Sequence, residues 1–294
     1  MVSERKLNDF RLLESARSEH RHQEPDRSAA DRGKMIVSVR PDDMISNQTS
    51  TKRNSANAGN STTKSKVLAI DIGGTNVKLL ASGQKEMRKV PSGPTLTARE
   101  MVAKVKSAVR DWPYDVISIG YPGPVVQGRP ISEPFNLAPG WVKFDFRKAF
   151  GKPVKIINDA AMQAVGSYKK GRMLFLGLGT GLGSAMIVDG VLQPMELAHL
   201  PFKKGRTYED YLGRRGLERL GQKKWQKNVF AAVAQLKQAV QADDVVLGGG
   251  NAKKLTDLPA DVRLGNNNNA FIGGFRMWQD ESVRHGIVRT AGSK

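Results

Sequence analysis

The sequence of 294 residues contains no cysteine, which excludes disulfide bonds and thiolate metal sites. It also lacks any apolar run near the roughly 20 residues that a helix needs to cross a bilayer. Its charged N-terminal stretch has no signal-peptide core. We therefore expect a cytoplasmic protein with no membrane association. Aromatic residues form only 6% of the chain and are unclustered, which makes a nucleic-acid partner with base-stacking aromatics an unfavoured interpretation.

Acidic side chains are too few to balance the basic ones. The chain carries 47 Lys and Arg against 28 Asp and Glu, a formal net charge of +19. Residues 1–64 hold 12 of these bases and 9 of these acids, so +3 lies there and +16 lies on residues 65–294. A positive surface of that size predicts a polyanionic partner, such as a nucleic acid, an anionic lipid or a long phosphate chain. A generally basic protein surface is the alternative.

The first 65 residues have little apolar content and are rich in Ser, Asn, Thr and Arg. Such a segment cannot offset the entropy lost on ordering, so we expect a disordered basic and polar tail over residues 1–65. In the rest of the chain, short apolar runs alternate with helical periodicity, and polar residues or glycines follow the runs. This alternation predicts α/β architecture with ligands at the carboxyl ends of strands.

Two apolar runs between Val67 and Ala81 are separated by Asp71, Gly73, Gly74 and Thr75. The pattern predicts two strands joined by a tight turn. Asp71 is buried by this pattern, and a buried carboxylate costs free energy unless it is paired or holds a cation. The glycines allow backbone N–H groups to approach an anion closely. A plain hairpin with Asp before a glycine pair is the alternative.

A second glycine-rich turn, Gly177–Gly183, has glycine at every second position between two predicted strands. It matches neither the P-loop motif nor the dinucleotide fingerprint. Its amides, with the hydroxyl of Thr180, suit phosphate oxygens. Gly248–Gly250 follows another predicted strand in the same way. A flexible hairpin remains the alternative in both places.

Polar side chains form two further groups. Asn158 and Asp159 follow an apolar strand, where Asp159 is either a general base or a helix N-cap. Glu196 and His199 are spaced so that they can bind adjacent hydroxyls, although an isolated His is commonly an ordinary core or surface residue. Glu209 lies in the polar stretch that follows. Because no cysteine lies nearby, we expect no zinc site.

In combination, these segments resemble the ROK family of sugar kinases over residues 66–285. The motifs that carry the resemblance are Asp71–Thr75, Tyr121–Gly123, Asn158–Asp159, Leu178–Gly183 and Glu196–His199. The resemblance implies an α/β, two-lobed actin/hexokinase-type (ribonuclease H-like) fold. The lobes would be residues 66–160, completed by a C-terminal helix at 275–294, and residues 161–274.

The resemblance also implies roles for single residues. Asp159 would deprotonate the 6-hydroxyl of glucose, and its other hydroxyls would be held by Asn158, Glu196, His199 and Glu209. Asp71 would bind Mg²⁺. The phosphoryl donor would be surrounded by Asp71, Gly73, Gly74, Thr75, Asn76, Lys78, Gly179, Thr180, Gly181, Gly249 and Gly250. Family members are commonly homodimers, so the resemblance implies a homodimer.

Two departures from the family pattern concern the region after Glu196. Ala198 stands where the family usually has Gly, and the cysteine cluster that follows the histidine in many members is missing. The cysteine-free form is similar to members that use polyphosphate. Residues 201–227 also hold nine bases and three acids, enough for a basic track along a phosphate chain, or for an ordinary solvated helix face. The donor is therefore expected to be polyphosphate, ATP or both.

Two other functions remain open. One is an ATP-dependent ROK kinase for another hexose. The other is a non-catalytic, sugar-responsive transcription regulator, which requires a winged helix-turn-helix before residue 66. The sequence of the tail shows no such pattern.

Overall fold

The computed structural model describes residues 65–266, 268–279 and 284–285. Apart from Ser65, the predicted disordered tail lies outside these residues, as does any DNA-binding element before residue 66. Within the described part of the chain, no helix is both long enough and apolar enough to cross a membrane.

The first sheet has five strands in the order β3-β2-β1-β4-β7. β1, β2 and β3 form an antiparallel meander, whereas β4 and β7 extend the sheet on the other side of β1 in parallel. Every residue of β1 and β4 is buried, as expected for central strands covered on both faces. The bounds are β1 Val67–Ile72, β2 Asn76–Ala81, β3 Arg88–Pro91, β4 Val116–Tyr121 and β7 Val154–Asn158.

The second sheet has six strands in the order β14-β13-β8-β9-β10-β15. β8, β9 and β10 again form an antiparallel meander, and β13 and β14 again join in parallel beyond its first strand. The two sheets therefore share one strand order around β1 and β8. The bounds are β8 Arg172–Leu178, β9 Leu182–Val188, β10 Val191–Met195, β13 Asp244–Gly248, β14 Val262–Leu264 and β15 Arg284–His285.

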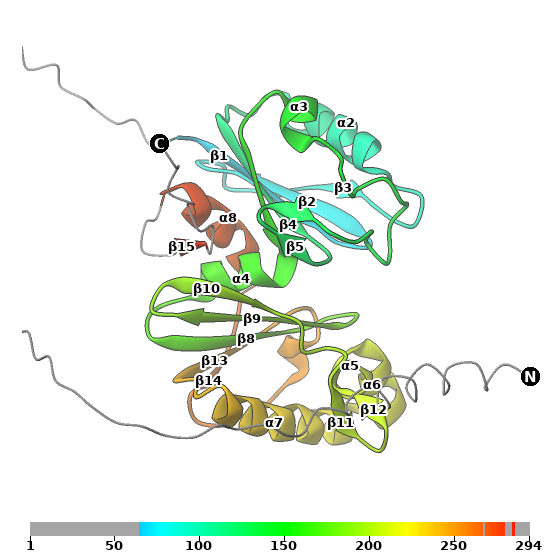
Figure 1. The fold of residues 1–294 in the computed structure, drawn as a ribbon, viewed down its shortest axis with the longest axis vertical. Coiled ribbons are helices and arrows are strands. Elements are labelled where there is room, and N and C mark those ends of the chain that lie inside the picture. The colour runs from blue at the N-terminus through cyan, green and yellow to red at the C-terminus, as the bar shows by residue number, and fades with distance from the viewer. Residues whose placement is uncertain (1–64, 267, 280–283, 286–294) are drawn as a thin grey trace, which may run out of the picture. The chain divides into compact units, whose positions relative to one another are not determined.

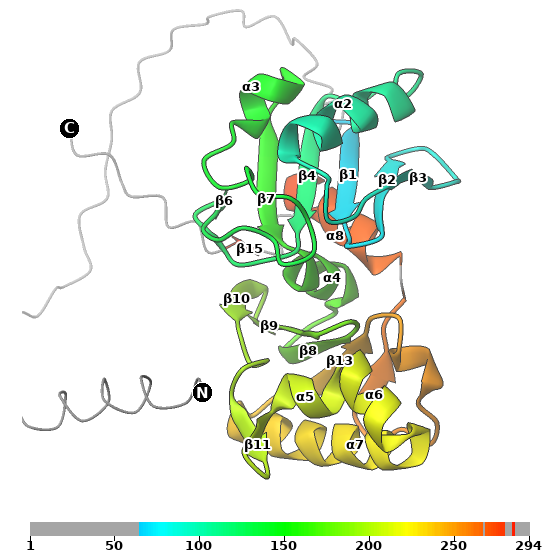
Figure 2. The same cartoon turned by 90° about the vertical axis from the view of Figure 1, so that its right-hand side faces the viewer.

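Two helices lie between the sheets, α4 (Asp159–Ser167) and α8 (Asn269–Gln279), as Figures 1 and 2 show. They cross at van der Waals contact because glycines face each other there. A Cβ on Gly166 would strike the backbone of Asn269, and a Cβ on Gly273 would strike the carbonyl of Met162. Gly274 lies equally close to Ala69 of β1, with 2.7 Å from its ideal Cβ position to the Ala69 Cβ. This tight packing positions the start of α4 between the sheets.

The outer faces of the sheets are covered by other helices. α2 (Ala98–Ala108) and α3 (Phe146–Phe150) pack on the first sheet around the buried Trp141. α5 (Tyr208–Leu212) and α7 (Gln222–Ala239) pack on the second around the buried Trp225. The remaining elements are β5 Val125–Val126, β6 Arg129–Pro130, β11 Pro201–Lys203, β12 Arg206–Thr207, α6 Arg214–Leu220 and the 3₁₀ turn η1 Ala252–Lys254.

The predicted alternation of strands and helices is confirmed, with differences at the margins. The helix predicted at 275–294 begins earlier, at Asn269, and is described only to Gln279. It packs on β1 and β4 of the first sheet. The helical residues between Tyr208 and Ala239 are divided into α5, α6 and α7, because Gly213 and Gly221 end the first two helices. The lobe boundaries remain a prediction.

Candidate active site

The first predicted phosphate-binding turn, residues 71–76 (the donor turn), joins β1 to β2. Asp71 is only 7% exposed. It pairs in register with Lys78, whose Nζ donates to Asp71 Oδ2 at 3.1 Å. Gly73 N–H donates across the turn to Asn76 O at 3.0 Å, and no Cβ fits comfortably at Gly73, because it would lie 3.0 Å from that carbonyl. The buried carboxylate of Asp71 is thus paired with a lysine. The turn that follows it has an exposed backbone at Gly74 and Thr75.

Asn158 and Asp159 form the junction of β7 and α4. Asn158 is the N-cap, since its Oδ1 accepts from Ala161 N–H at 3.1 Å. Asp159 Oδ1 accepts from Ala160 N–H at 2.8 Å and from Asn158 Nδ2 at 3.1 Å. No other described residue donates a hydrogen bond to Asp159 Oδ2. The capping role weighed for Asp159 therefore falls to its neighbour, which leaves one carboxylate oxygen of Asp159 available.

Asp159 lies beside Asp71 because β4 carries a glycine between them. Gly120 pairs in register with Asp71, and the ideal position of its missing Cβ is 3.4 Å from the Asp159 Cα. The residue as a whole is partly exposed, but its carboxyl is recessed. Burial, and then the negative charge of Asp71, raise the pKa of Asp159 to about 7. A carboxyl with that pKa can both accept and release a proton near neutral pH.

The second turn, residues 177–183 (the glycine hairpin), joins β8 to β9, as predicted. Its carbonyls are bonded within the protein: Gly179 O accepts from Arg214 N–H and Asn251 Nδ2, each at 3.0 Å. Among the described residues, the amides of Thr180 and Gly181 have no partner. Two adjacent unpaired amides at a strand end are a site for phosphate oxygens.

The predicted loop at Gly248–Gly250 lies directly against this hairpin. Gly249 has φ +83°, and a Cβ there would strike the backbone of Leu178. Asn251, which follows it, donates from its backbone N–H to Leu178 O at 2.9 Å. The two predicted glycine segments are therefore brought together. Asn251 was not among the predicted site residues, although its place after three glycines was a visible signal.

The base of the glycine hairpin contacts α4. A Cβ on Gly183 would lie 2.6 Å from that of Ala160, so only glycine permits this approach. The next residue, Ser184, has its Oγ bonded to Met195 O and to Leu197 N–H, each at 3.1 Å. This contact fixes the start of residues 196–200, which we call the acceptor loop. Asp159, the hairpin and the acceptor loop are thus joined through Gly183 and Ser184.

In the acceptor loop, both Glu196 and His199 are exposed. Of the two ordinary locations weighed for His199, core or surface, the structure shows the surface, and its role in hydroxyl binding stays a prediction. Within the described part of the chain, Glu196 Oε1 accepts only from Ala198 N–H, at 3.3 Å. Glu209 is bonded to both segments: its N–H donates to Ala198 O at 3.0 Å, and its Oε2 accepts from Leu182 N–H of the glycine hairpin at 3.2 Å. Its role in hydroxyl binding stays a prediction.

Asp71 was predicted to bind Mg²⁺, and its surroundings fit that ion. Within the described residues, no three His, Asp or Glu side chains gather into a metal cage. Mg²⁺ in phosphoryl-transfer sites needs no such cage, because one or two carboxylates, water and the substrate phosphates complete its coordination. Lys78 occupies only one of the two oxygens of Asp71. Asp71, whose second carboxylate oxygen is not bonded to Lys78, is therefore a suitable ligand.

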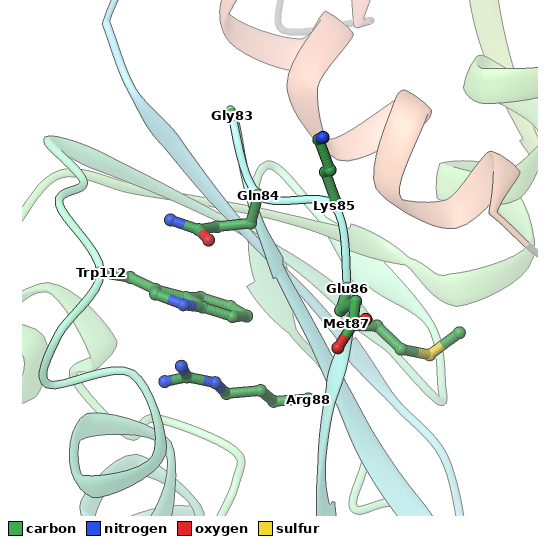
Figure 3. A pocket seen from close by; sticks show the side chains of 7 residues that line it. All are labelled: Gly83, Gln84, Lys85, Glu86, Met87, Arg88 and Trp112. Carbon is green, nitrogen blue, oxygen red and sulfur yellow. The ribbon is translucent and has the colours of Figure 1, made fainter.

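A surface hollow near Trp112 does not belong to this group. Figure 3 shows its lining by residues 83–88, which run from the β2–β3 turn to the first residue of β3, and by Trp112. The Arg88 guanidinium lies 4.2 Å from the Trp112 ring centroid and donates to Asp111 Oδ2 at 2.7 Å. The donor turn is at the other end of β2, about 20 Å away at the usual rise of a strand. We therefore do not include this hollow in the candidate site.

The geometry can now be compared with known proteins. The ROK family model matches residues 67–194. A polyphosphate glucokinase of Mycobacterium tuberculosis is 26% identical over 235 residues, covering 70% of this chain and 85% of that protein. The crystal structure of an inorganic polyphosphate/ATP-glucomannokinase from Arthrobacter sp. strain KM matches with a TM-score of 0.63 at 25% identity, covering 72% and 98% of the two chains.

A ROK family glucokinase from Streptomyces griseus, solved with glucose and AMPPNP, matches with a TM-score of 0.61 at 16% identity. That match covers 72% of this chain and 99% of the other, and at this identity it shows the fold alone. The predicted resemblance to the ROK family and the actin/hexokinase-type fold are both confirmed.

Proposed function

Because residues 67–194 match the ROK family and the chain has the fold of ROK sugar kinases, we propose that this protein transfers a phosphoryl group to the 6-hydroxyl of glucose. The donor is polyphosphate, ATP or both. The observation that carries the proposal is Asp159, which has a recessed carboxyl, one unpartnered oxygen and a pKa near neutrality.

Asp159 acts as the general base. Its free oxygen accepts the proton of the 6-hydroxyl as that oxygen attacks the terminal phosphorus of the donor. The bond between this phosphorus and the leaving phosphate oxygen then breaks, and the shortened donor departs. Asn158, Glu196, His199 and Glu209 hold the remaining hydroxyls. Bound sugar displaces water from the carboxyl, and correct positioning supplies much of the rate.

The donor phosphates lie between the donor turn and the glycine hairpin. The unpaired amides of Thr180 and Gly181 and the Lys78 ammonium face the phosphate oxygens. Asp71 would hold Mg²⁺, and the bound ion would supply neutralisation of negative charge on the phosphates. The further members of the donor site are Gly73, Gly74, Thr75, Asn76, Gly179, Gly249 and Gly250, which contribute backbone or small polar groups.

A basic surface supports polyphosphate as a donor. All nine bases of residues 201–227 are exposed, on β11, β12, α6, α7 and the turns beside them. Among the described residues, Lys204, Lys223, Lys224 and Lys227 have no ion-pair partner. This surface begins at Arg214, whose N–H contacts Gly179 and Thr180 of the glycine hairpin. A long phosphate chain that leaves the hairpin therefore meets unpaired cations, whereas the short phosphate tail of ATP needs few of them.

The test is a matrix of purified full-length protein with glucose, mannose and N-acetylmannosamine against polyphosphate and ATP, each with Mg²⁺. Formation of glucose 6-phosphate supports the proposal. Turnover of another hexose with ATP alone would establish the alternative kinase. Absence of turnover in every combination, together with a hexose-sensitive gel shift on DNA, would establish the regulator. The homodimer remains a prediction, to be checked by sedimentation.

A further inference from the structure

Glu209 lies at the meeting point of two parts of the proposed site. It is the second residue of α5, and its N–H donates to Ala198 O at 3.0 Å. The N–H of the preceding Tyr208 donates to Leu200 O at 3.1 Å. These two bonds fix the start of α5 to the acceptor loop, which is one side of the junction.

The carboxylate of Glu209 faces the other side, the glycine hairpin. Its Oε2 accepts from Leu182 N–H at 3.2 Å, while its Oε1 lies 3.5 Å from Arg215 Nη2. A Cβ on Gly181 would strike Oε2, so this glycine provides the space that the carboxylate occupies. The side chain is 25% exposed, which leaves room for a further ligand.

The end of α5 leads to the same hairpin. Gly213 N–H donates to Glu209 O at 2.9 Å, and the ideal Cβ position of Gly213 is 3.0 Å from Thr180 O. Arg214 N–H then bonds both Gly179 O, at 3.0 Å, and Thr180 O, at 3.2 Å. The five-residue helix α5 is thus a short rigid link between the acceptor loop and the tip of the hairpin.

We propose that Glu209 is a positioning residue that couples the acceptor loop to the glycine hairpin. A bound sugar hydroxyl fixes the orientation of the Glu209 carboxylate. The carboxylate then holds the Leu182 amide, and this bond orders the neighbouring donor-binding amides of Thr180 and Gly181. Because coupling between two binding equilibria is reciprocal, a change confined to the hairpin alters sugar affinity. The coupling rests on the proposed function, since it requires that Glu209 binds a sugar hydroxyl and that the hairpin amides bind the phosphoryl donor.

The test uses Gly181→Ala, with Asp257→Asn as a control outside the proposed site. Gly181 has an ordinary backbone angle, and the new methyl at this position meets the flexible end of Glu209. Asp257 is exposed, and its φ of +49° is tolerated by Asn. Glucose affinity of the full chain is measured by calorimetry without any phosphoryl donor. We expect Gly181→Ala to weaken glucose binding within the range of about 5–150-fold that is typical of coupled sites, and Asp257→Asn to leave it within about 2-fold.

Glucose binding by Gly181→Ala that equals that of the wild type overturns the coupling and leaves the proposed function intact. If the wild-type protein binds no hexose, the proposed function fails, and hydrogen exchange then decides the positioning role. Glu209→Ala should accelerate exchange in the peptide that spans residues 178–182. Glu209→Gln, which keeps an acceptor oxygen for Leu182 N–H, should leave it slow. Equal exchange in the wild type and Glu209→Ala overturns the positioning role itself.

Discussion

Asp71 and Asp159 are two acids held on either side of a glycine, and the charge of the first raises the pKa of the second. Lys78 is bonded to Asp71, so Asp159 has no cation of its own among the described residues. The first three predictions follow from this pair, in which one carboxyl is bonded to a lysine and the other is not.

Replacing Asp159 with Asn removes the proposed base while keeping its size and its bond to Ala160 N–H. We expect kcat for glucose phosphorylation to fall by about 10²–10⁴ and glucose affinity to change little. Steady-state kinetics and calorimetry measure the two quantities. Asp257→Asn is the control, because Asp257 is exposed and its φ of +49° is tolerated by Asn. A variant at position 159 that keeps more than half its kcat would contradict the assignment.

The pH dependence of the reaction should follow Asp159. The carboxylate is the active form, so kcat/KM should fall as pH decreases through about 7. Asp71→Asn removes the neighbouring negative charge and should move this inflection to lower pH, whatever it does to the rate. A pH series between 5 and 9 on both proteins measures the shift. An unchanged inflection would show that Asp71 does not influence the base.

Stability should depend on pH through the same group. The pKa of Asp159 is about 7 in the folded protein and 3.8 for the unperturbed side chain, so the folded state binds more protons in the interval between these values. The free energy of unfolding therefore decreases as pH rises from about 4 to about 7 because of this residue. Asp159→Asn lacks that loss, so its melting temperature relative to the wild type should be higher at pH 8 than at pH 4. An equal difference at both pH values would contradict the raised pKa.

The basic surface predicts how donor use depends on charge. Lys223→Glu/Lys224→Glu should raise KM for long polyphosphate several-fold, with little effect on ATP. Salt should reduce polyphosphate turnover steeply, because exposed charges are screened. The matched control, Arg99→Glu/Lys104→Glu, changes two exposed bases on α2, which packs on the other sheet. If the two double variants change KM for polyphosphate equally, the salt dependence arises from the net charge of the protein and not from the basic surface of residues 201–227.

Much of this arrangement could be predicted from local sequence. The donor turn and the glycine hairpin were predicted because each is a short glycine segment between two apolar runs. The two strands that flank each turn then pair with each other as a hairpin. The short strands β3 and β14 and the five-residue α3 were not predicted, since none has enough residues to establish a period.

Contacts between distant segments could not be predicted in this way. The approach of Gly183 to Ala160 and the bond from Leu182 N–H to Glu209 depend on how the sheets and helices pack. No local pattern states that Asn158 is the cap and Asp159 is not, because either side chain is a good N-cap.

The shared strand order of the two sheets gives their first turns equivalent positions. The donor turn and the glycine hairpin each join the first two strands of a meander. The first turn begins with an acid that pairs with a lysine of β2, whereas the second has four glycines and Thr180. Equivalent places in the two sheets therefore offer different chemistry, a charged pair in one and bare backbone amides in the other.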